Sequence, residues 1–162
     1  MHVLWAPWRM AYVAAQKERT CIFCAARDTD DQRAALVLAR RPALIMLNKF
    51  PYANGHLMVA PRRHAAHLDA LSPDEFATLM RAVHRTATLL DTALRPDGMN
   101  LGINLGAAAG AGVKDHLHWH IVPRWLGDTN FMPMLADVRV IPEHLDATYS
   151  RLEPLFRTLA TG

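Results

Sequence analysis

His116-Leu117-His118-Trp119-His120-Ile121-Val122 carries a histidine at every second position over its first five residues. Successive side chains of a β-strand point to opposite faces of the sheet, so a strand here would place all three imidazoles on one face. One histidine on an apolar face is more often a buried structural residue. Three in alternation instead predict a functional site, and we expect the chemistry of the protein to be centred on this segment.

Two kinds of chemistry use such a row of imidazoles. Neutral imidazole is a common metal ligand, and an imidazole can also attack phosphorus while its neighbours hydrogen-bond the phosphate oxygens. Gly110-Ala111-Gly112 shortly precedes the row, and backbone N–H groups of so bare a loop can approach an anion closely. The loop favours a phosphate ligand, but the residues alone leave both interpretations open.

The flanking sequence predicts an α+β fold. Short apolar runs at 34–38, 43–47, 56–60 and 99–105 are typical of strands. Ser72-Pro73-Asp74-Glu75 offers an N-cap, a helical proline and a capping box, and apolar residues then recur at helical spacing until Arg95-Pro96-Asp97-Gly98. A last helix is expected within 141–159. Most connections are too short for parallel crossovers, so the sheet is predicted to be antiparallel.

Length and composition limit the class of protein. The 162 residues fit one domain, 1–162, with residues 1–20 as an aromatic-rich N-terminal arm. Hydrophobic residues make up 51% and charged residues 20%, which excludes a disordered chain. A net charge of +3 is too small for a protein that coats nucleic acid, and no run approaches the roughly 20 apolar residues of a membrane span. We expect neither nucleic acid nor membrane as a partner.

Cys21-Ile22-Phe23-Cys24 contains both cysteines of the chain. Two cysteines do not form a disulfide framework in a chain of this length, and the CxxC spacing is more typical of half a metal site in a reducing compartment. The sequence also has no apolar signal-peptide core near its start. A cytoplasmic location is therefore expected.

Several motifs together resemble the histidine-triad (HIT) superfamily of nucleotide hydrolases and transferases. The row matches the pattern His-φ-His-φ-His-φ-φ, where φ is apolar. Four segments that precede the row also match the family in order and spacing: 21–24, 48–61, His64 and 104–106. Residues 4–9 and 123–133 are similar to a bacterial branch that includes diadenosine tetraphosphate (Ap4A) phosphorylases. The resemblance implies a five-stranded antiparallel sheet with two main helices, and a homodimer.

The resemblance also implies roles for individual residues. His118 would be the nucleophile that takes the nucleotidyl group, and His120 would hydrogen-bond the phosphate. Asn104 and the loop from Gly110 to Gly112 would donate hydrogen bonds to the phosphate. Asn48 would bind the ribose hydroxyls. The base pocket would be lined by Ile22, Phe23 and Phe50. Phe23 and Phe50 could equally be ordinary core aromatics. Where the family often has a phosphate-binding serine, this chain has Ala111-Gly112-Val113-Lys114, so backbone or Lys114 must replace it.

A structural zinc is implied in the same way. Its ligands would be Cys21, Cys24, His64 and His116, a closed tetrahedral set with no position left for a reactive water. His67 could replace His64, and the alternative is a pair of free buried cysteines. No organic cofactor is expected, and His56, His84 and His144 are assigned to structure or surface.

The resulting hypothesis is nucleotidyl transfer through a covalent His118 intermediate. Ap4A is the expected substrate, cleaved with inorganic phosphate to ADP and ATP, or with water to AMP and ATP. Three alternatives remain open: a purine nucleoside phosphoramidate hydrolase, a nucleotide-binding protein with vestigial catalysis, and a hydrolase in which all three histidines bind a catalytic zinc.

Overall fold

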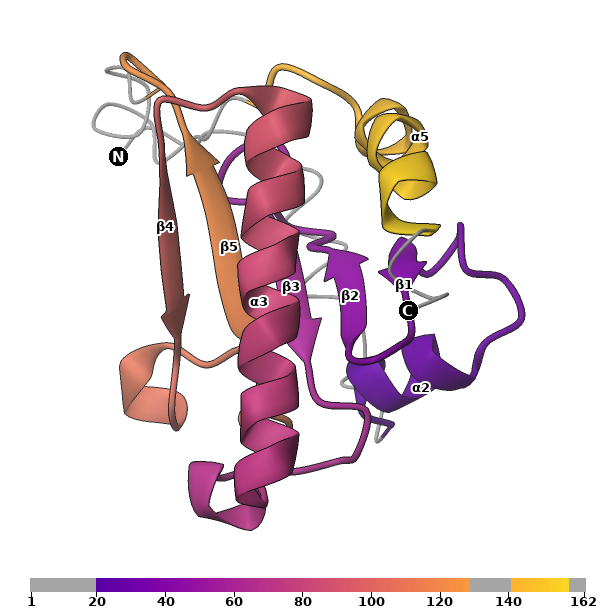
Figure 1. Ribbon diagram of the computed structural model, residues 1–162, viewed down its shortest axis with the longest axis vertical. Coiled ribbons are helices and arrows are strands. Elements are labelled where there is room, and N and C mark those ends of the chain that lie inside the picture. The colour runs from indigo at the N-terminus through magenta and orange to yellow at the C-terminus, as the bar shows by residue number, and fades with distance from the viewer. Residues whose placement is uncertain (1–19, 129–140, 158–162) are drawn as a thin grey trace, which may run out of the picture.

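A five-stranded antiparallel sheet organises the protein, whose structure is a computed structural model that describes residues 20–128 and 141–157. The strand order is β1-β2-β3-β5-β4 (Figure 1). The elements are α2 (Ile22–Asp28), β1 (Val37–Ala39), β2 (Leu44–Leu47), β3 (Leu57–Ala60), η1 (Leu68–Ala70), α3 (Pro73–Leu94), β4 (Gly98–Ile103), η2 (Ala107–Ala109), β5 (Trp119–Arg124) and α5 (Leu145–Phe156). The predicted α+β class with an antiparallel sheet is confirmed.

The two main helices, α3 and α5, lie where the sequence predicts helices. Ser72 accepts a hydrogen bond from the Glu75 amide while the Glu75 carboxylate accepts one from the Ser72 amide, so the predicted capping box forms at the start of α3. The helix ends with Arg95 in the left-handed conformation. Figure 1 shows α3 packed over the sheet and running along the direction of its strands, with α5 beside it near β1.

Helix α2 is a third helix that the sequence reading did not anticipate. It has seven residues, no side-chain cap at its N-terminus and no acidic residue in its first turn. Isolated helices of this length are unstable in water, so tertiary contacts must hold it in place. Local sequence signals for such a helix are correspondingly weak.

The sequence predicts one strand that contains the whole histidine row, and this prediction is wrong in part. Strand β5 begins at Trp119, so His116 and His118 precede it. The reason is a contact with a distant segment: the Leu117 amide donates to the Ala65 carbonyl, in the loop after β3, instead of joining the ladder. His120 remains in the sheet, paired with Met58 on one side and Gly102 on the other.

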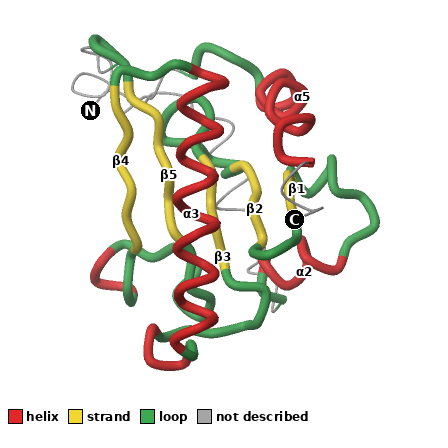
Figure 2. The backbone as a smooth tube through the Cα atoms, viewed as in Figure 1, coloured by secondary structure: helices red, strands yellow, loops and turns green. Residues whose placement is uncertain are grey.

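Side chains that alternate along the strands divide the core between the two faces of the sheet. Figure 2 shows α3 over the middle of the sheet, where it contacts β3 and β5. We call the side covered by α3 and α5 the helix face; its strand residues include Ile45, Leu47, Leu57, Val59 and Ile121. We call the other side the histidine face; α2 covers part of it, and its apolar cluster comprises Phe23, Ala26, Val37, Leu44, Met46, Met58 and Ala60.

Some sequence predictions fall outside the described residues. The N-terminal arm lies there except for Thr20, and so do residues 129–133 of the segment after the triad and the end of the last predicted helix. Within the described part of the chain, no helix has the length and apolar character required to cross a bilayer.

Candidate active site and metal centre

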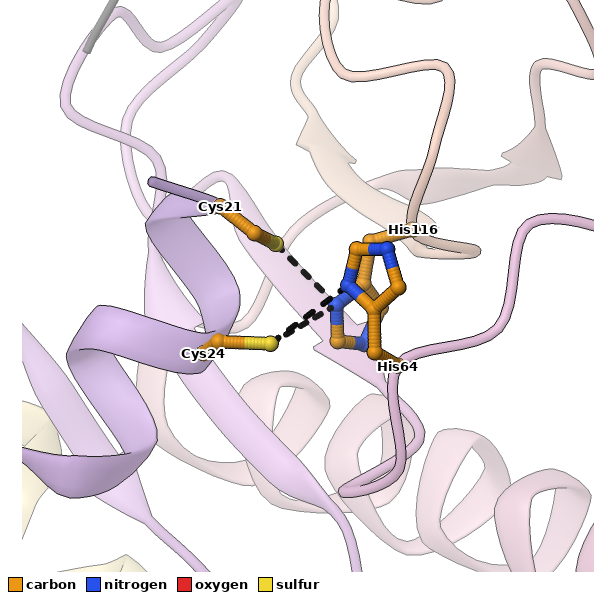
Figure 3. Close-up of side chains that lie close together, drawn as sticks. All are labelled: Cys21, Cys24, His64 and His116. Carbon is orange, nitrogen blue, oxygen red and sulfur yellow. Dashed lines mark hydrogen bonds between the residues drawn. The ribbon is translucent and has the colours of Figure 1, made fainter. Parts of the chain in front are cut away.

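Four potential metal ligands converge beside the histidine face (Figure 3). Cys21 occupies the N-cap position of α2, Cys24 lies in the first turn of that helix, His64 follows β3, and His116 precedes β5. Their ligand atoms all lie within 4.8 Å of one another. Cys21 Sγ is 3.2 Å and Cys24 Sγ 3.8 Å from His116 Nδ1, and Cys24 Sγ is 3.5 Å from His64 Nδ1.

These distances suit an ion with tetrahedral coordination. Zinc bonds of about 2.3 Å to sulfur and 2.0–2.1 Å to nitrogen require ligand atoms about 3.4–3.8 Å apart, close to the three separations found here. Two thiolates and two imidazoles are also a donor set that selects zinc. His67 is not part of the cluster among the described residues, whereas His64 is. The residues therefore fit the predicted closed zinc site, which leaves no ligand position for chemistry.

A backbone group orients the ligand His116. Its Nε2 lies 2.9 Å from the Pro61 carbonyl, which can only accept, so Nε2 carries the proton and the Nδ1 lone pair faces the two thiols. Burial lowers the pKa of His116, which keeps the ring neutral as a metal ligand must be. The fold thus supplies the required tautomer.

His118 is oriented in the opposite sense. Its Nδ1 lies 2.9 Å from the His116 carbonyl and must donate, which leaves the Nε2 lone pair available. The ring packs between Phe23 and His120, each with ring centroids 4.8 Å away. Burial lowers the pKa of His118, favouring the neutral ring. A fixed, neutral imidazole with a free Nε2 has the properties of a nucleophile.

His120 is oriented through a chain of hydrogen bonds. The Tyr52 amide donates to Nδ1 of His56, so the proton of a neutral His56 sits on Nε2, which lies 2.9 Å from Nδ1 of His120. His120 then accepts at Nδ1 and carries its own proton on Nε2, as a donor. Burial first and His118 second lower the pKa of His120 to about 4.

The glycine-rich loop lies between Asn104 and His116 in the sequence, and within it the N–H groups of Gly110 and Ala111 donate to the Ala107 and Gly106 carbonyls. Gly106 and Gly110 have φ of +78° and +84°, which favour glycine, whereas Gly112 has no positive φ. A Cβ at any of the three would meet no atom within 4 Å. Neither crowding nor strain explains the glycine at position 112, and the open space suits close approach of a ligand. Asn104 lies one residue beyond β4, at the same end of the β4–β5 ladder.

Comparisons with known proteins agree with this geometry. The HIT domain model matches residues 29–125. The chain is 35% identical over 154 residues to an AP-4-A phosphorylase of Mycobacterium tuberculosis, covering 90% of this chain and 79% of that protein. The chain belongs to the HIT family. A zinc-bound histidine triad family protein from Mycobacterium smegmatis has a similar structure, with a TM-score of 0.67, 28% identity, and coverage of 86% of this chain and 95% of that one.

A second solved structure supports the same fold. A hypothetical histidine triad nucleotide-binding protein from Sulfolobus tokodaii matches with a TM-score of 0.66 and 26% identity, covering 85% of this chain and 90% of that one. Members of the HIT family are nucleotide hydrolases or transferases, so the prediction of an enzyme is confirmed.

The residues expected to bind the nucleoside lie in different environments of this HIT enzyme. Ile22 and Phe50 are 45% and 42% exposed, as side chains that meet a ligand can be. Phe23 is fully buried against the rings of His116 and His118. Asn48 is half-buried, and its side-chain oxygen accepts from the Phe50 amide, which shapes this loop. Their roles toward a nucleoside stay predictions.

His56 is the functional candidate that sequence reasoning underestimated. It is fully buried and bonded to His120, although the two lie 64 residues apart in sequence. A fully buried histidine requires polar partners. The sequence signal was its place at the start of the strand that pairs with β5, next to Asn54-Gly55. His84 and His144 are exposed, in agreement with a surface assignment.

Proposed function

We propose that this HIT enzyme transfers a nucleotidyl group through a covalent intermediate on His118, with Ap4A as substrate and inorganic phosphate as acceptor. The observation that carries the proposal is the hydrogen bond from His118 Nδ1 to the His116 carbonyl, which aims the Nε2 lone pair away from its own backbone. The 35% identity to an AP-4-A phosphorylase supports the choice of substrate and acceptor.

The proposed reaction has two steps. In the first, His118 Nε2 forms a bond to the α-phosphorus of one adenosine, and the bond from that phosphorus to the bridging oxygen breaks to release ATP. In the second, a phosphate oxygen attacks the same phosphorus, the P–N bond breaks, and ADP leaves. The imidazole becomes cationic in between, and its Nδ1–H bond to the His116 carbonyl strengthens as that charge develops.

Positioning of the phosphate falls to uncharged donors. His120 Nε2–H, fixed by His56, is available to a phosphate oxygen. The backbone N–H of Gly112 can also approach a phosphate, because a Cβ there would meet no atom within 4 Å, whereas the N–H groups of Gly110 and Ala111 already donate to the Ala107 and Gly106 carbonyls. Lys114 is exposed two residues after Gly112, and its cation is proposed to bind the outer phosphates. On the nucleoside side, Ile22 and Phe50 would hold the base and Asn48 the ribose.

The metal site is proposed to be structural. When bound there, zinc would tie α2 to His64 and His116, and it would supply stability. All four positions around the ion would be occupied by protein. The free thiols of Cys21 and Cys24 also suit a reducing, cytoplasmic setting.

A homodimer through β4 is part of the proposal. In the described part of the chain, β4 is an edge strand paired only with β5, and Leu101 and Leu105 are exposed on or next to it. A second copy could extend the sheet across this edge and cover both leucines. Light scattering during gel filtration tests this directly, with Leu101→Asp expected to give a monomer.

The test of the function is product analysis with pure protein. Wild type, His118→Ala and the control His84→Ala are each incubated with Ap4A, with and without inorganic phosphate, and the nucleotides are separated. We expect phosphate-dependent ADP and ATP from wild type and the control, and no turnover by His118→Ala.

Other products would change the assignment. AMP and ATP formed without phosphate would make the protein a hydrolase. Absence of turnover, combined with cleavage of an AMP phosphoramidate, would replace the substrate. Tight AMP binding without any turnover would overturn the proposal in favour of a nucleotide-binding protein. Full activity of His118→Ala would exclude His118 as the nucleophile.

A further inference from the structure

Phe23 contacts the metal centre and the nucleophile at the same time. Its ring centroid lies 5.1 Å from that of His116, a metal-ligand candidate, and 4.8 Å from that of His118. It is fully buried, and in sequence it lies between the two thiols, two residues after Cys21 and one before Cys24. No other ring in the described residues contacts both of these histidines.

The helix that carries Phe23 depends on its tethers. Helix α2 has seven residues and lacks a side-chain cap, so its own hydrogen bonds cannot hold it. The tethers that the structure shows are the two thiols at the metal centre, the burial of Phe23 and Ala26 against the sheet, and a bond from Arg27 to the Arg62 carbonyl. Two of the four ligand atoms are therefore on the element that positions Phe23.

The nucleophile in turn has few constraints on its ring. One hydrogen bond, to the His116 carbonyl, fixes its tautomer, and two rings enclose it, Phe23 at an interplanar angle of 36° and His120 at 75°. The carbonyl belongs to a ligand candidate, and Phe23 belongs to the tethered helix. The hydrogen bond to His116 and the contact with Phe23 therefore both connect the His118 ring to residues of the metal centre or of the helix that it tethers.

We propose that Phe23 is a positioning residue that couples occupancy of the Cys21, Cys24, His64 and His116 site to the orientation of His118. A bound ion holds α2 against the sheet, and Phe23 then keeps the His118 ring in the orientation in which Nδ1 bonds the His116 carbonyl. This inference rests on the proposed nucleophilic role of His118 for its effect on turnover, but the coupling itself can be measured without substrate.

The experiment uses the full chain with ¹⁵N-labelled histidine, with and without one equivalent of zinc. Long-range ¹H–¹⁵N spectra report the tautomer of each ring, and His118→Ala assigns the signals. In zinc-loaded wild type we expect His118 to show one tautomer, protonated at Nδ1; zinc removal should give a mixture. Zinc-loaded Phe23→Leu should resemble zinc-free wild type although it binds zinc stoichiometrically, with kcat reduced about tenfold and KM nearly unchanged.

Val37→Ala is the matched control, because Val37 lies in the same apolar cluster but on β1, with β2 and β3 between it and β5. It should keep the wild-type response to zinc. Identical His118 spectra in zinc-loaded and zinc-free wild type would overturn the coupling, as would a wild-type response in Phe23→Leu. If Phe23→Leu does not fold, the comparison of zinc-loaded with zinc-free wild type tests the coupling. If zinc-free wild type does not fold, the comparison of zinc-loaded wild type with zinc-loaded Phe23→Leu tests it. Failure to turn over Ap4A with the spectral response intact would overturn the proposed function and leave the coupling standing.

Discussion

Residues that alternate along β2 and β3 send one set of side chains toward α3 and the other toward α2, and the two faces differ in what holds them. On the helix face, aliphatic side chains from β2, β3, β5, α3 and α5 form one large cluster. On the histidine face a smaller apolar cluster adjoins the metal centre and four imidazoles whose orientations are set by backbone groups or by one another.

This difference separates non-directional stabilisation from the directional contacts that position reactive groups. Apolar burial is non-directional and stabilises in proportion to area, so the helix face can hold the sheet without fixing any one polar atom. Hydrogen bonds and metal bonds are directional, so the histidine face fixes tautomers and lone pairs. Substitutions on the helix face should therefore change mainly the free energy of unfolding, and substitutions on the histidine face should also change kcat or KM.

The largest expected effect is on the helix face. Leu90 is fully buried on α3, and Leu90→Ala should lower the free energy of unfolding by about 2–5 kcal/mol because it leaves a cavity. Zinc content and kcat of the folded variant should be unchanged. Urea unfolding, metal analysis and Ap4A turnover measure the three quantities. Leu126→Ala is the control, since Leu126 is 90% exposed and should change stability by less than about 0.5 kcal/mol. Loss of zinc or kcat in folded Leu90→Ala would contradict the separation.

Acid should act on the histidine face. The pKa of His120 is lowered to about 4 in the folded protein, mainly by burial, whereas the pKa of histidine in an unfolded chain is about 6.5. Between these values the unfolded state binds a proton that the folded state does not. The free energy of unfolding therefore falls as pH drops from about 6.5 to about 4, by up to about 1.4 kcal/mol per unit.

A variant isolates this contribution. Burial also lowers the pKa of His116 and His118, so the wild-type slope contains several groups. Urea unfolding between pH 4 and pH 7 should give a shallower slope for His120→Gln, while the exposed control His84→Gln keeps the wild-type slope. Equal slopes for wild type and His120→Gln would show that His120 does not resist protonation in the fold.

The next effect concerns His56. His56→Phe removes the donor to His120 Nδ1, so His120 can take either tautomer, and kcat should fall about 10- to 100-fold. His56→Gln can still donate to His120 and should restore part of the rate. Zinc content should stay at the wild-type level in both variants, because His56 does not belong to the metal cluster. A wild-type kcat for His56→Phe would mean that the tautomer of His120 is fixed in another way.

The comparison of the faces also explains what the sequence could predict. Capping and apolar periodicity are local, so α3 was predicted from Ser72 to Arg95, and short apolar runs located the strands. The metal ligands followed from a family resemblance, and the structure brings those four side chains together. Helix α2 and the partner of His56 were missed because each depends on contacts between distant segments: the tethers of a seven-residue helix, and the pairing of β3 with β5.

The smallest effect is expected at Gly112, where the phosphate is proposed to approach the backbone. A Cβ there meets nothing within 4 Å and the backbone has no positive φ, so Gly112→Ala should change the free energy of unfolding by less than about 0.5 kcal/mol. The added methyl group would stand where a phosphate is proposed to approach the backbone, so KM for Ap4A should rise about tenfold, or about 1.4 kcal/mol of binding. Gly110→Ala provides the contrast, because φ there is +84° and alanine should also cost stability. Unfolding curves and steady-state kinetics on both variants separate the two causes. An unchanged KM for Gly112→Ala would mean that the open loop is not where the phosphate binds.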